Sequence, residues 1–112
     1  MSKQSDMGSS WSERYCILST REFRYYYNQY DAQTSPEMYL GQISLEVIYK
    51  YIQLSEQDVG RKYSFMMGAG CWYKRNELND KPREFIWACD TCEDFEDWLT
   101  NLEFTRTKCI YD

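Results

Sequence analysis

Residues 91–104, TCEDFEDWLTNLEF, predict an amphipathic helix around which the rest of the chain is organised. Four apolar residues fall at i, i+3, i+4 and i+7, the spacing of one face of a helix. They are Phe95, Trp98, Leu99 and Leu102. Thr91 precedes them with a hydroxyl that can accept a hydrogen bond from the first turn. Because burial of an indole contributes about 4–6 kcal/mol as an upper bound, we expect Trp98 to hold the helix on the core.

The chain before this helix has the pattern of successive β-strands. Six runs rich in aromatic and β-branched residues are separated by polar turn sequences. These runs cover residues 13–18, 22–28, 38–45, 46–55, 61–68 and 83–90. Residues 28–37 are predicted to be a polar loop, and residues 69–83 a long mixed stretch with a strong turn. Strands followed by one closing helix predict a mainly β fold with a single C-terminal α-helix.

Composition limits the kind of protein that this chain can be. Its 112 residues are enough for one domain with its own core. The net charge of −5 argues against a nucleic-acid partner, because neutralising phosphates requires a basic protein surface. The sequence has no apolar run of the ~18–20 residues that a membrane span needs, and no secretory signal is apparent. We therefore expect a cytoplasmic domain.

Cysteine chemistry and catalysis are both disfavoured by the residues present. Cys89 and Cys92 have the C-x-x-C spacing that also serves zinc and thiol redox sites. The chain has five cysteines and no histidine, and no second C-x-x-C supplies another pair of metal ligands. We expect reduced thiols, no metal and no cofactor. Without histidine or a glycine-rich phosphate loop, we also expect no catalytic residues and a protein that is not an enzyme.

Three segments, taken in order, resemble the pleckstrin-homology (PH) domain family. WSERYCIL at 11–18, followed by FRYYY at 23–27, is similar to the family's W-x-x-R strand and the aromatic strand after it. LGQISLEVI at 40–48 is similar to its fourth strand, and REFIWACDTCEDFEDWLTNL at 83–102 to its last strand and closing helix. The resemblance implies two near-orthogonal antiparallel sheets, with six to seven strands, capped by the C-terminal helix.

Comparison with the family pattern leaves the first strand unassigned. It would fall near residues 2–4, and its loss would leave an open sheet edge. We expect residues 11–106 to form the PH-like domain, residues 1–10 to be a flexible segment or a remnant of the first strand, and residues 107–112 to be a tail. The resemblance extends to degenerate PH-like domains of acylated peripheral membrane proteins, in which the acyl chain supplies part of the membrane affinity.

The family's best known activity is binding of phosphoinositide headgroups at the open end of the barrel. The resemblance transfers this role to four candidate residues, Lys3, Arg14, Arg24 and Tyr25. The pattern is incomplete, because Ser12 and Glu13 stand where a basic residue is usual and residues 36–39 supply none. The alternative for Arg14 and Arg24 is a solvated strand face paired with neighbouring glutamates.

A second basic and aromatic group lies in the loops around the fifth predicted strand and before the sixth. Its members are Arg61, Lys62, Trp72, Lys74, Arg75, Lys81 and Arg83. Each basic residue near an anionic bilayer contributes about 1 kcal/mol to binding, so this group is a candidate membrane surface. The alternative is that these charges merely balance an acidic chain.

These features favour a non-catalytic PH-like module that localises its parent protein at the inner face of a membrane. We expect it to act mainly by docking a protein partner, through an exposed sheet edge or residues 69–76, because its phosphoinositide site is degraded. The alternative is direct binding of phosphoinositide or other anionic phospholipid headgroups. A third hypothesis is a phosphotyrosine-binding-like superfold that captures a peptide by strand addition.

Overall fold

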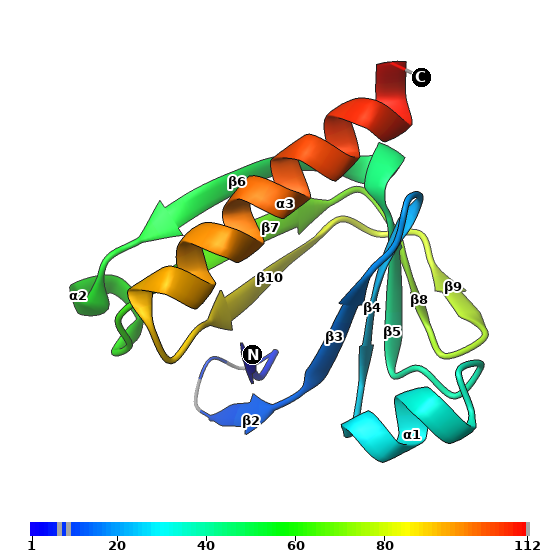
Figure 1. The fold of residues 1–112 in the computed structure, drawn as a ribbon, viewed down its shortest axis with the longest axis horizontal. Helices are drawn as coiled ribbons and strands as arrows, with labels where there is room; N and C mark the ends of the chain where they lie inside the picture. The colour runs from blue at the N-terminus through cyan, green and yellow to red at the C-terminus, as the bar shows by residue number, and fades with distance from the viewer. Residues whose placement is uncertain (7, 9, 112) are drawn as a thin grey trace.

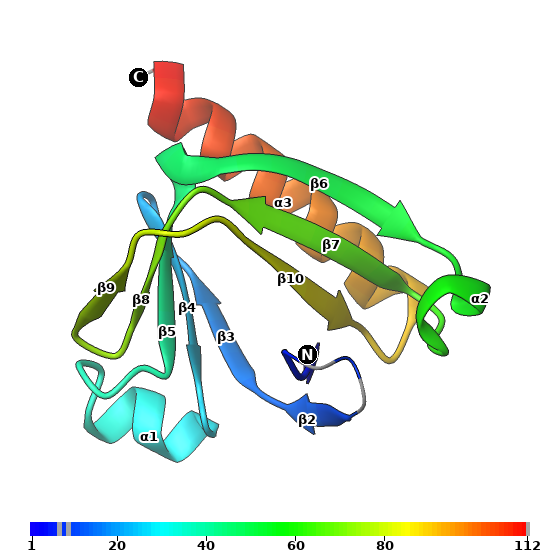
Figure 2. The ribbon, with the colours of Figure 1, turned by 180° about the vertical axis from the view of Figure 1, so that it is seen from behind.

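Two antiparallel sheets of five strands each face one another across the core, as the computed structural model shows for residues 1–6, 8 and 10–111 (Figures 1 and 2). The first sheet contains, in spatial order, β2 (Trp11–Glu13), β1 (Ser2–Gln4), β10 (Arg83–Ala88), β7 (Ser64–Ala69) and β6 (Ile48–Leu54). The second contains β3 (Tyr15–Leu18), β4 (Glu22–Tyr26), β5 (Gly41–Ser44), β8 (Trp72–Lys74) and β9 (Glu77–Asn79). The predicted fold class, β sheets with a C-terminal helix, is confirmed, although the structure has more strand segments than we counted.

The first strand is present near residues 2–4, where the family resemblance placed it, although local patterns indicated only six strands. Strand β1 pairs with β10, Ser2 opposite Ala88, and on its other side with β2, Ser2 opposite Glu13. Its sequence, SKQ, has no apolar alternation that would mark a strand. Its register is set instead by pairing with the two neighbouring strands. The edge of β10 is therefore covered within the described residues.

The predicted strand at 13–18 is divided between the two sheets. Strand β2 ends at Glu13 in the first sheet, and β3 begins at Tyr15 in the second. Arg14 lies between them and is therefore at the corner where the chain passes from one sheet to the other. The sequence pattern did not reveal this division, because the residue types alternate continuously through the corner.

Two segments predicted to be irregular contain secondary structure. In the predicted loop 28–37, Asn28 caps the short helix α1 (Gln29–Thr34), its side-chain oxygen accepting from the Asp31 N–H at 2.8 Å. In the stretch 69–83, β8 and β9 form a hairpin whose turn includes Arg75 at φ 55°. The hairpin forms because β8 pairs with β5, a long-range contact that local propensity does not report.

Three helical segments complete the fold. The 3-10 turn η1 (Leu45–Val47) and the short helix α2 (Glu56–Val59) lie before and after β6. Helix α3 (Cys92–Tyr111) extends beyond the predicted end at residue 104, so residues 107–111 are helical where we expected a tail. The Arg106 guanidinium donates to the Ile48 carbonyl at 2.9 Å and ties this last part of α3 to the sheet. None of the described helices combines the length and apolar character needed to cross a bilayer.

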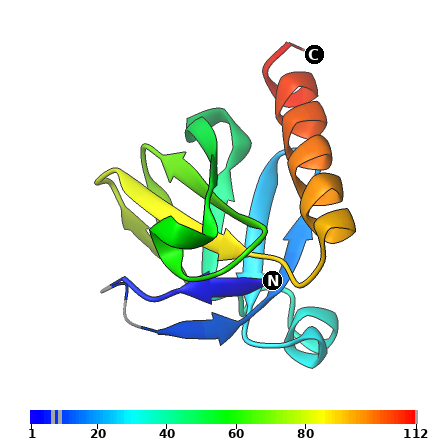
Figure 3. The ribbon, with the colours of Figure 1, turned by 90° about the vertical axis from the view of Figure 1, so that its left-hand side faces the viewer.

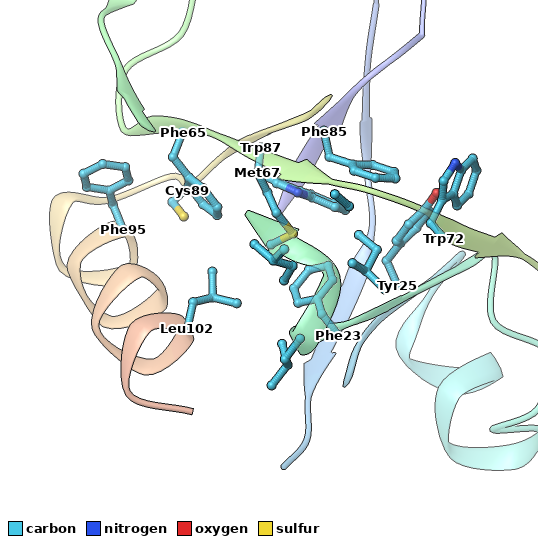
Figure 4. Close-up of a cluster of buried hydrophobic side chains, with 14 residues drawn as sticks. Phe23, Tyr25, Phe65, Met67, Trp72, Phe85, Trp87, Cys89, Phe95 and Leu102 are labelled. Atoms are coloured by element: carbon cyan, nitrogen blue, oxygen red, sulfur yellow. The ribbon is translucent and has the colours of Figure 1, made fainter. Parts of the chain in front are cut away.

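Trp87 is at the centre of the core, between the two sheets (Figure 4). Its indole is fully buried, with ring centroids 5.2 Å from Phe23 and 5.3 Å from Tyr25, both edge-on. Phe85 lies two residues earlier on β10 and is also buried, as the alternation of this strand predicts. This aromatic cluster joins β10 of the first sheet to β4 of the second.

Helix α3 covers one side of this cluster with its predicted apolar face. Phe95 and Leu102 are buried, whereas Trp98 and Leu99 are half-buried against the same cluster. The Trp98 ring meets Phe23 edge-on at 5.9 Å. Trp98 therefore contributes to the contact between the helix and the sheets, but it buries less apolar surface than a fully buried indole would.

Replacing Leu102 with alanine should lower the free energy of unfolding by about 2–5 kcal/mol, because the lost side chain leaves a cavity in the core. Phe104→Ala, on the same helix, is the control, since Phe104 is 63% exposed and its loss should cost only about 0.5 kcal/mol. Chemical denaturation followed by tryptophan fluorescence measures both values. Equal losses would contradict the assignment of the buried face.

Candidate anion-binding site

A pocket of about 450 Å³ opens between the two sheets, near the N-terminal strands and the β8–β9 hairpin. Five of its described lining residues are basic: Lys3, Arg14, Lys74, Arg75 and Arg83. Asp6 is the acidic residue among them, and Tyr25 and Trp72 contribute aromatic surface. This concentration of cations suits a ligand with several negative charges.

The strand register explains why residues far apart in the sequence meet here. Tyr25 on β4 is opposite Gly41 on β5, and Gly41 is in turn opposite Lys74 on β8. On the other sheet, Lys3 of β1 is opposite Trp87 of β10 and shares its inward face. Side chains from both sheets are therefore directed into the same space.

The structure brings together three of the four residues that the resemblance indicated. Lys3, Arg14 and Tyr25 line the pocket, but Arg24 does not. Arg24 is next to Tyr25 on β4, and its side chain is therefore on the opposite face of the strand. There it donates to the Gln42 side-chain carbonyl at 2.7 Å and pairs with Glu22 at 3.1 Å.

The second basic group is divided by the fold. Lys74, Arg75 and Arg83 line the pocket, with Trp72 beside them. Arg61 instead lies 4.9 Å from the Trp11 ring and donates to the Ser2 hydroxyl at 3.0 Å. Lys62 and Lys81 are exposed and do not line the pocket. Sequence spacing gave no sign of this division, because only the β5–β8 pairing places the hairpin at the pocket.

Lys3 is a largely buried cation of the site, with 13% of its side chain exposed. Its ammonium lies 5.6 Å from the centroid of the Tyr25 ring and 3.8 Å from the Asp6 carboxylate. Burial, and then the nearby charge of Arg83, lower the pKa of Lys3 to about 8. A bound anion would favour the charged form and raise this pKa.

Arg83 is held against the aromatic wall of the pocket. Its guanidinium carbon lies 4.6 Å from the Trp72 ring centroid and 4.4 Å from that of Phe85. Its Nη2 also contacts the Asp6 carboxylate, which is within ion-pair distance of Lys3. Asp6 therefore occupies, as an internal carboxylate, the position at which an external anion would meet both cations.

Tyr25 provides a neutral hydrogen-bonding group at the pocket wall. Its ring passes directly over Gly41, where a Cβ would lie only 2.2 Å from the nearest ring carbon. Burial raises the pKa of the Tyr25 phenol to about 12, so the hydroxyl stays protonated and able to donate. Gly41 is needed because a larger residue would displace this ring.

Arg14 and the turn after β8 form the outer part of the pocket. The Arg14 guanidinium lies 5.3 Å from the Tyr27 ring and donates to the Glu13 carbonyl at 2.8 Å. The Arg75 N–H donates to the Leu40 carbonyl at 3.2 Å, which fixes the hairpin turn against the start of β5. These contacts hold the outer cations near the inner ones.

The C-x-x-C cysteines are at a separate place in the fold. Cys89 is buried just after β10, where burial raises the pKa of its thiol to about 11. Cys92 is exposed at the start of α3, and its pKa is also raised, by desolvation and then by the hydrogen bond to Glu96. A raised pKa lowers the fraction of thiolate, the reactive form, at neutral pH. Within residues 1–6, 8 and 10–111, no three His, Cys, Asp or Glu side chains converge as metal ligands.

The fold and the pocket together define a class of protein: a small two-sheet module closed on one side by a helix, with a cationic cavity at its open end. A family model, the PH domain, matches residues 1–106. The chain therefore belongs to the PH domain family. No curated protein sequence gives a significant match.

Solved structures support the same fold. The Slm1 PH domain in complex with inositol-4-phosphate has a TM-score of 0.67 and 15% sequence identity, covering 93% of this chain and 89% of that chain. A second Slm1 PH structure has a TM-score of 0.69 and 14% identity, covering 94% and 91%. The PH domain of human KIAA0053 protein has a TM-score of 0.67 and 19% identity, covering 95% and 83%. At these identities, the similarity shows the fold alone.

The lowered pKa of Lys3 should make anion binding in the pocket depend on pH. At pH 7, below the pKa of about 8, Lys3 is charged, and at pH 9 it is mostly neutral. The affinity for sulfate, whose own charge is constant in this range, should therefore fall by up to about tenfold between pH 7 and pH 9. A Lys3→Arg variant stays charged and should show a smaller fall in an NMR titration. Equal pH dependence in both proteins would contradict the role of Lys3.

Removing the internal carboxylate should strengthen anion binding. In Asp6→Asn, Lys3 and Arg83 lose a competing partner, and sulfate should bind several-fold more tightly. Glu103→Gln, an exposed position on α3 outside the pocket, makes the same change in net charge and should have little effect. Unchanged affinity in Asp6→Asn would show that the Asp6 carboxylate does not compete for the site.

Proposed function

We propose that this PH domain is a non-catalytic module that recruits its parent protein to a membrane by binding phosphorylated lipid headgroups in the cationic pocket. The observation that carries the proposal is the convergence of five basic side chains on one cavity. Phosphate groups are bound most strongly by charge-assisted hydrogen bonds from Arg and Lys, and the pocket offers these from four separate chain segments. A protein recruited in this way would be cytoplasmic and would lie peripherally at the inner face of a membrane.

Headgroup binding is favoured here over protein docking, the function that the sequence pattern favoured. In the sequence the phosphate-binding pattern is incomplete, because Ser12 occupies a usual basic position and the loop before β5 supplies no cation. In the folded chain, Lys74 and Arg75 of the hairpin and Arg83 of β10 stand beside Lys3 and Arg14. Cations from these other elements compensate for the missing ones.

The charge distribution also supports a membrane-facing pocket. The chain has a net charge of −5, yet the pocket lining has five basic residues and Asp6. Much of the acidic charge is on the exposed first half of α3, at Glu93, Asp94, Glu96 and Asp97. A protein with such charge separation is oriented by an anionic surface, its basic end toward the lipid.

The Slm1 relative suggests the first ligand to test. That PH domain was determined in complex with inositol-4-phosphate. A second structure of it is described as binding ligand at a site other than the usual one, so the position of that ligand is not transferred to this chain. The shared chemistry, a phosphorylated inositol ring, is what the pocket of this chain would recognise.

Protein docking is the second candidate function, and a groove between β3 and α3 favours it. Two hollows, of about 490 and 360 Å³, share Thr105 and are lined in part by Leu18, Trp98 and Phe104. Strand β3 is at an edge of its sheet, so its outward backbone groups are available to a partner strand. This groove is separate from the cationic pocket.

Neutralising two pocket cations tests the proposed function. Lys74→Gln with Arg75→Gln should weaken binding to phosphatidylcholine vesicles containing phosphatidylinositol-4-phosphate by about tenfold or more, since each contact contributes about 1 kcal/mol. Lys62→Gln with Lys81→Gln removes the same charge outside the pocket and should have a smaller effect. Vesicle sedimentation measures both variants.

Two outcomes would overturn this proposal. One is a wild-type domain that does not bind these vesicles at low salt, which would leave docking as the favoured function. The other is an equal loss of binding in the two double variants, which would indicate a diffuse electrostatic attraction without a defined pocket.

A further inference from the structure

The segment between β4 and β5 exposes several apolar side chains. Tyr27 is 62% exposed, Tyr30 on α1 is 71% exposed, and Met38 is 57% exposed. We call these three residues the α1 rim. Tyrosine combines an apolar ring with a polar hydroxyl, and such side chains are favoured where hydrocarbon meets water.

The α1 rim is held in place from beneath. Tyr26, Ala32 and Tyr39 form a small buried cluster that fixes α1 and the following loop to the sheet. The Tyr26 hydroxyl donates to the Pro36 carbonyl at 2.7 Å. The exposed side chains are therefore presented by a packed segment, which reduces the entropy lost when they contact a partner.

The α1 rim is at the same end of the molecule as the cationic pocket. Figures 1 and 3 show α1 at the lower end together with β2, whereas the C-terminal end of α3 points the other way. Tyr27 contacts the pocket directly, because the Arg14 guanidinium lies 5.3 Å from its ring. Leu40, two residues after Met38, also lines the pocket.

We propose that the α1 rim contacts the bilayer interface when a headgroup occupies the pocket, Tyr30 and Met38 lying among the lipids around the bound one. This inference rests on the proposed function, and it commits the pocket to membrane lipid in preference to a free inositol phosphate. The segment has two acids, Asp31 and Glu37, and no basic residue. Its contribution to binding is therefore apolar, whereas the pocket supplies the electrostatic contribution.

The test separates headgroup recognition from bilayer contact. The variant is Tyr30→Ser with Met38→Ser, and Tyr27 is left unchanged because it touches Arg14. Its affinity for soluble inositol-4-phosphate should stay within about twofold of the wild-type value, since neither residue lines the pocket. Its affinity for vesicles containing phosphatidylinositol-4-phosphate should fall at least about fivefold, because apolar contact with the interface is lost. Binding that persists at high salt should fall the most.

The matched control is Ile110→Ser with Tyr111→Ser, two exposed residues at the far end of α3. It removes similar side chains and should leave vesicle binding unchanged. Circular dichroism checks that each variant is folded, and single-residue variants replace any double variant that is not.

Each result of this experiment has one meaning. Vesicle binding that is unchanged in the α1 rim variant, with normal binding by the wild type, overturns this inference and leaves the proposed function intact. Wild-type protein that binds neither soluble inositol-4-phosphate nor vesicles overturns both. Equal losses in the α1 rim variant and the control variant also overturn the inference, because the effect would not be specific to the pocket end.

Discussion

Packing of Trp87 against Phe23 and Tyr25 joins the two sheets, and the position of the pocket depends on it. Trp87 is on β10 of the first sheet, and its partners are on β4 of the second, with ring centroids 5.2 and 5.3 Å away. Tyr25 extends from this contact to the pocket wall, so the core and the site share a side chain. The Lys3 ammonium lies over the same ring, which means that the aromatic core also sets the position of this cation.

The pocket combines two opposing effects on its cations. Burial, and then the like charge of Arg83, disfavour protonated Lys3 and lower its pKa. Asp6 compensates in part through its contacts with Lys3 and Arg83. The proposed binding of an external anion would replace this internal carboxylate as the partner of Lys3 and Arg83. The acidic side chains in the first half of α3 are exposed, so solvent screens their charges more strongly than those of the pocket.

Much of the fold could be predicted from local patterns. The apolar period of α3 and the alternation in β10 predicted which face of each element meets the core, because such periods report one-sided burial directly. The β8–β9 hairpin was missed, because its two three-residue strands are held by pairing with a distant strand. Strand β1 was expected near residues 2–4 only from the family resemblance, because its three residues have no strand pattern of their own. Helix α1 was missed because it is short and polar, and its N-cap, Asn28, is common in loops as well.

The sequence by itself determined the fold class, the buried face of the last helix and, through a family resemblance, that Lys3, Arg14 and Tyr25 could share a site. Only the tertiary structure decided the composition of that site. Strand pairing aligned Lys74 with Gly41 and Tyr25, and the sheet arrangement directed Arg83 into the same space. The physical reason is that side-chain periodicity acts over neighbouring residues, whereas a cationic pocket is assembled from strand registers that no local pattern encodes.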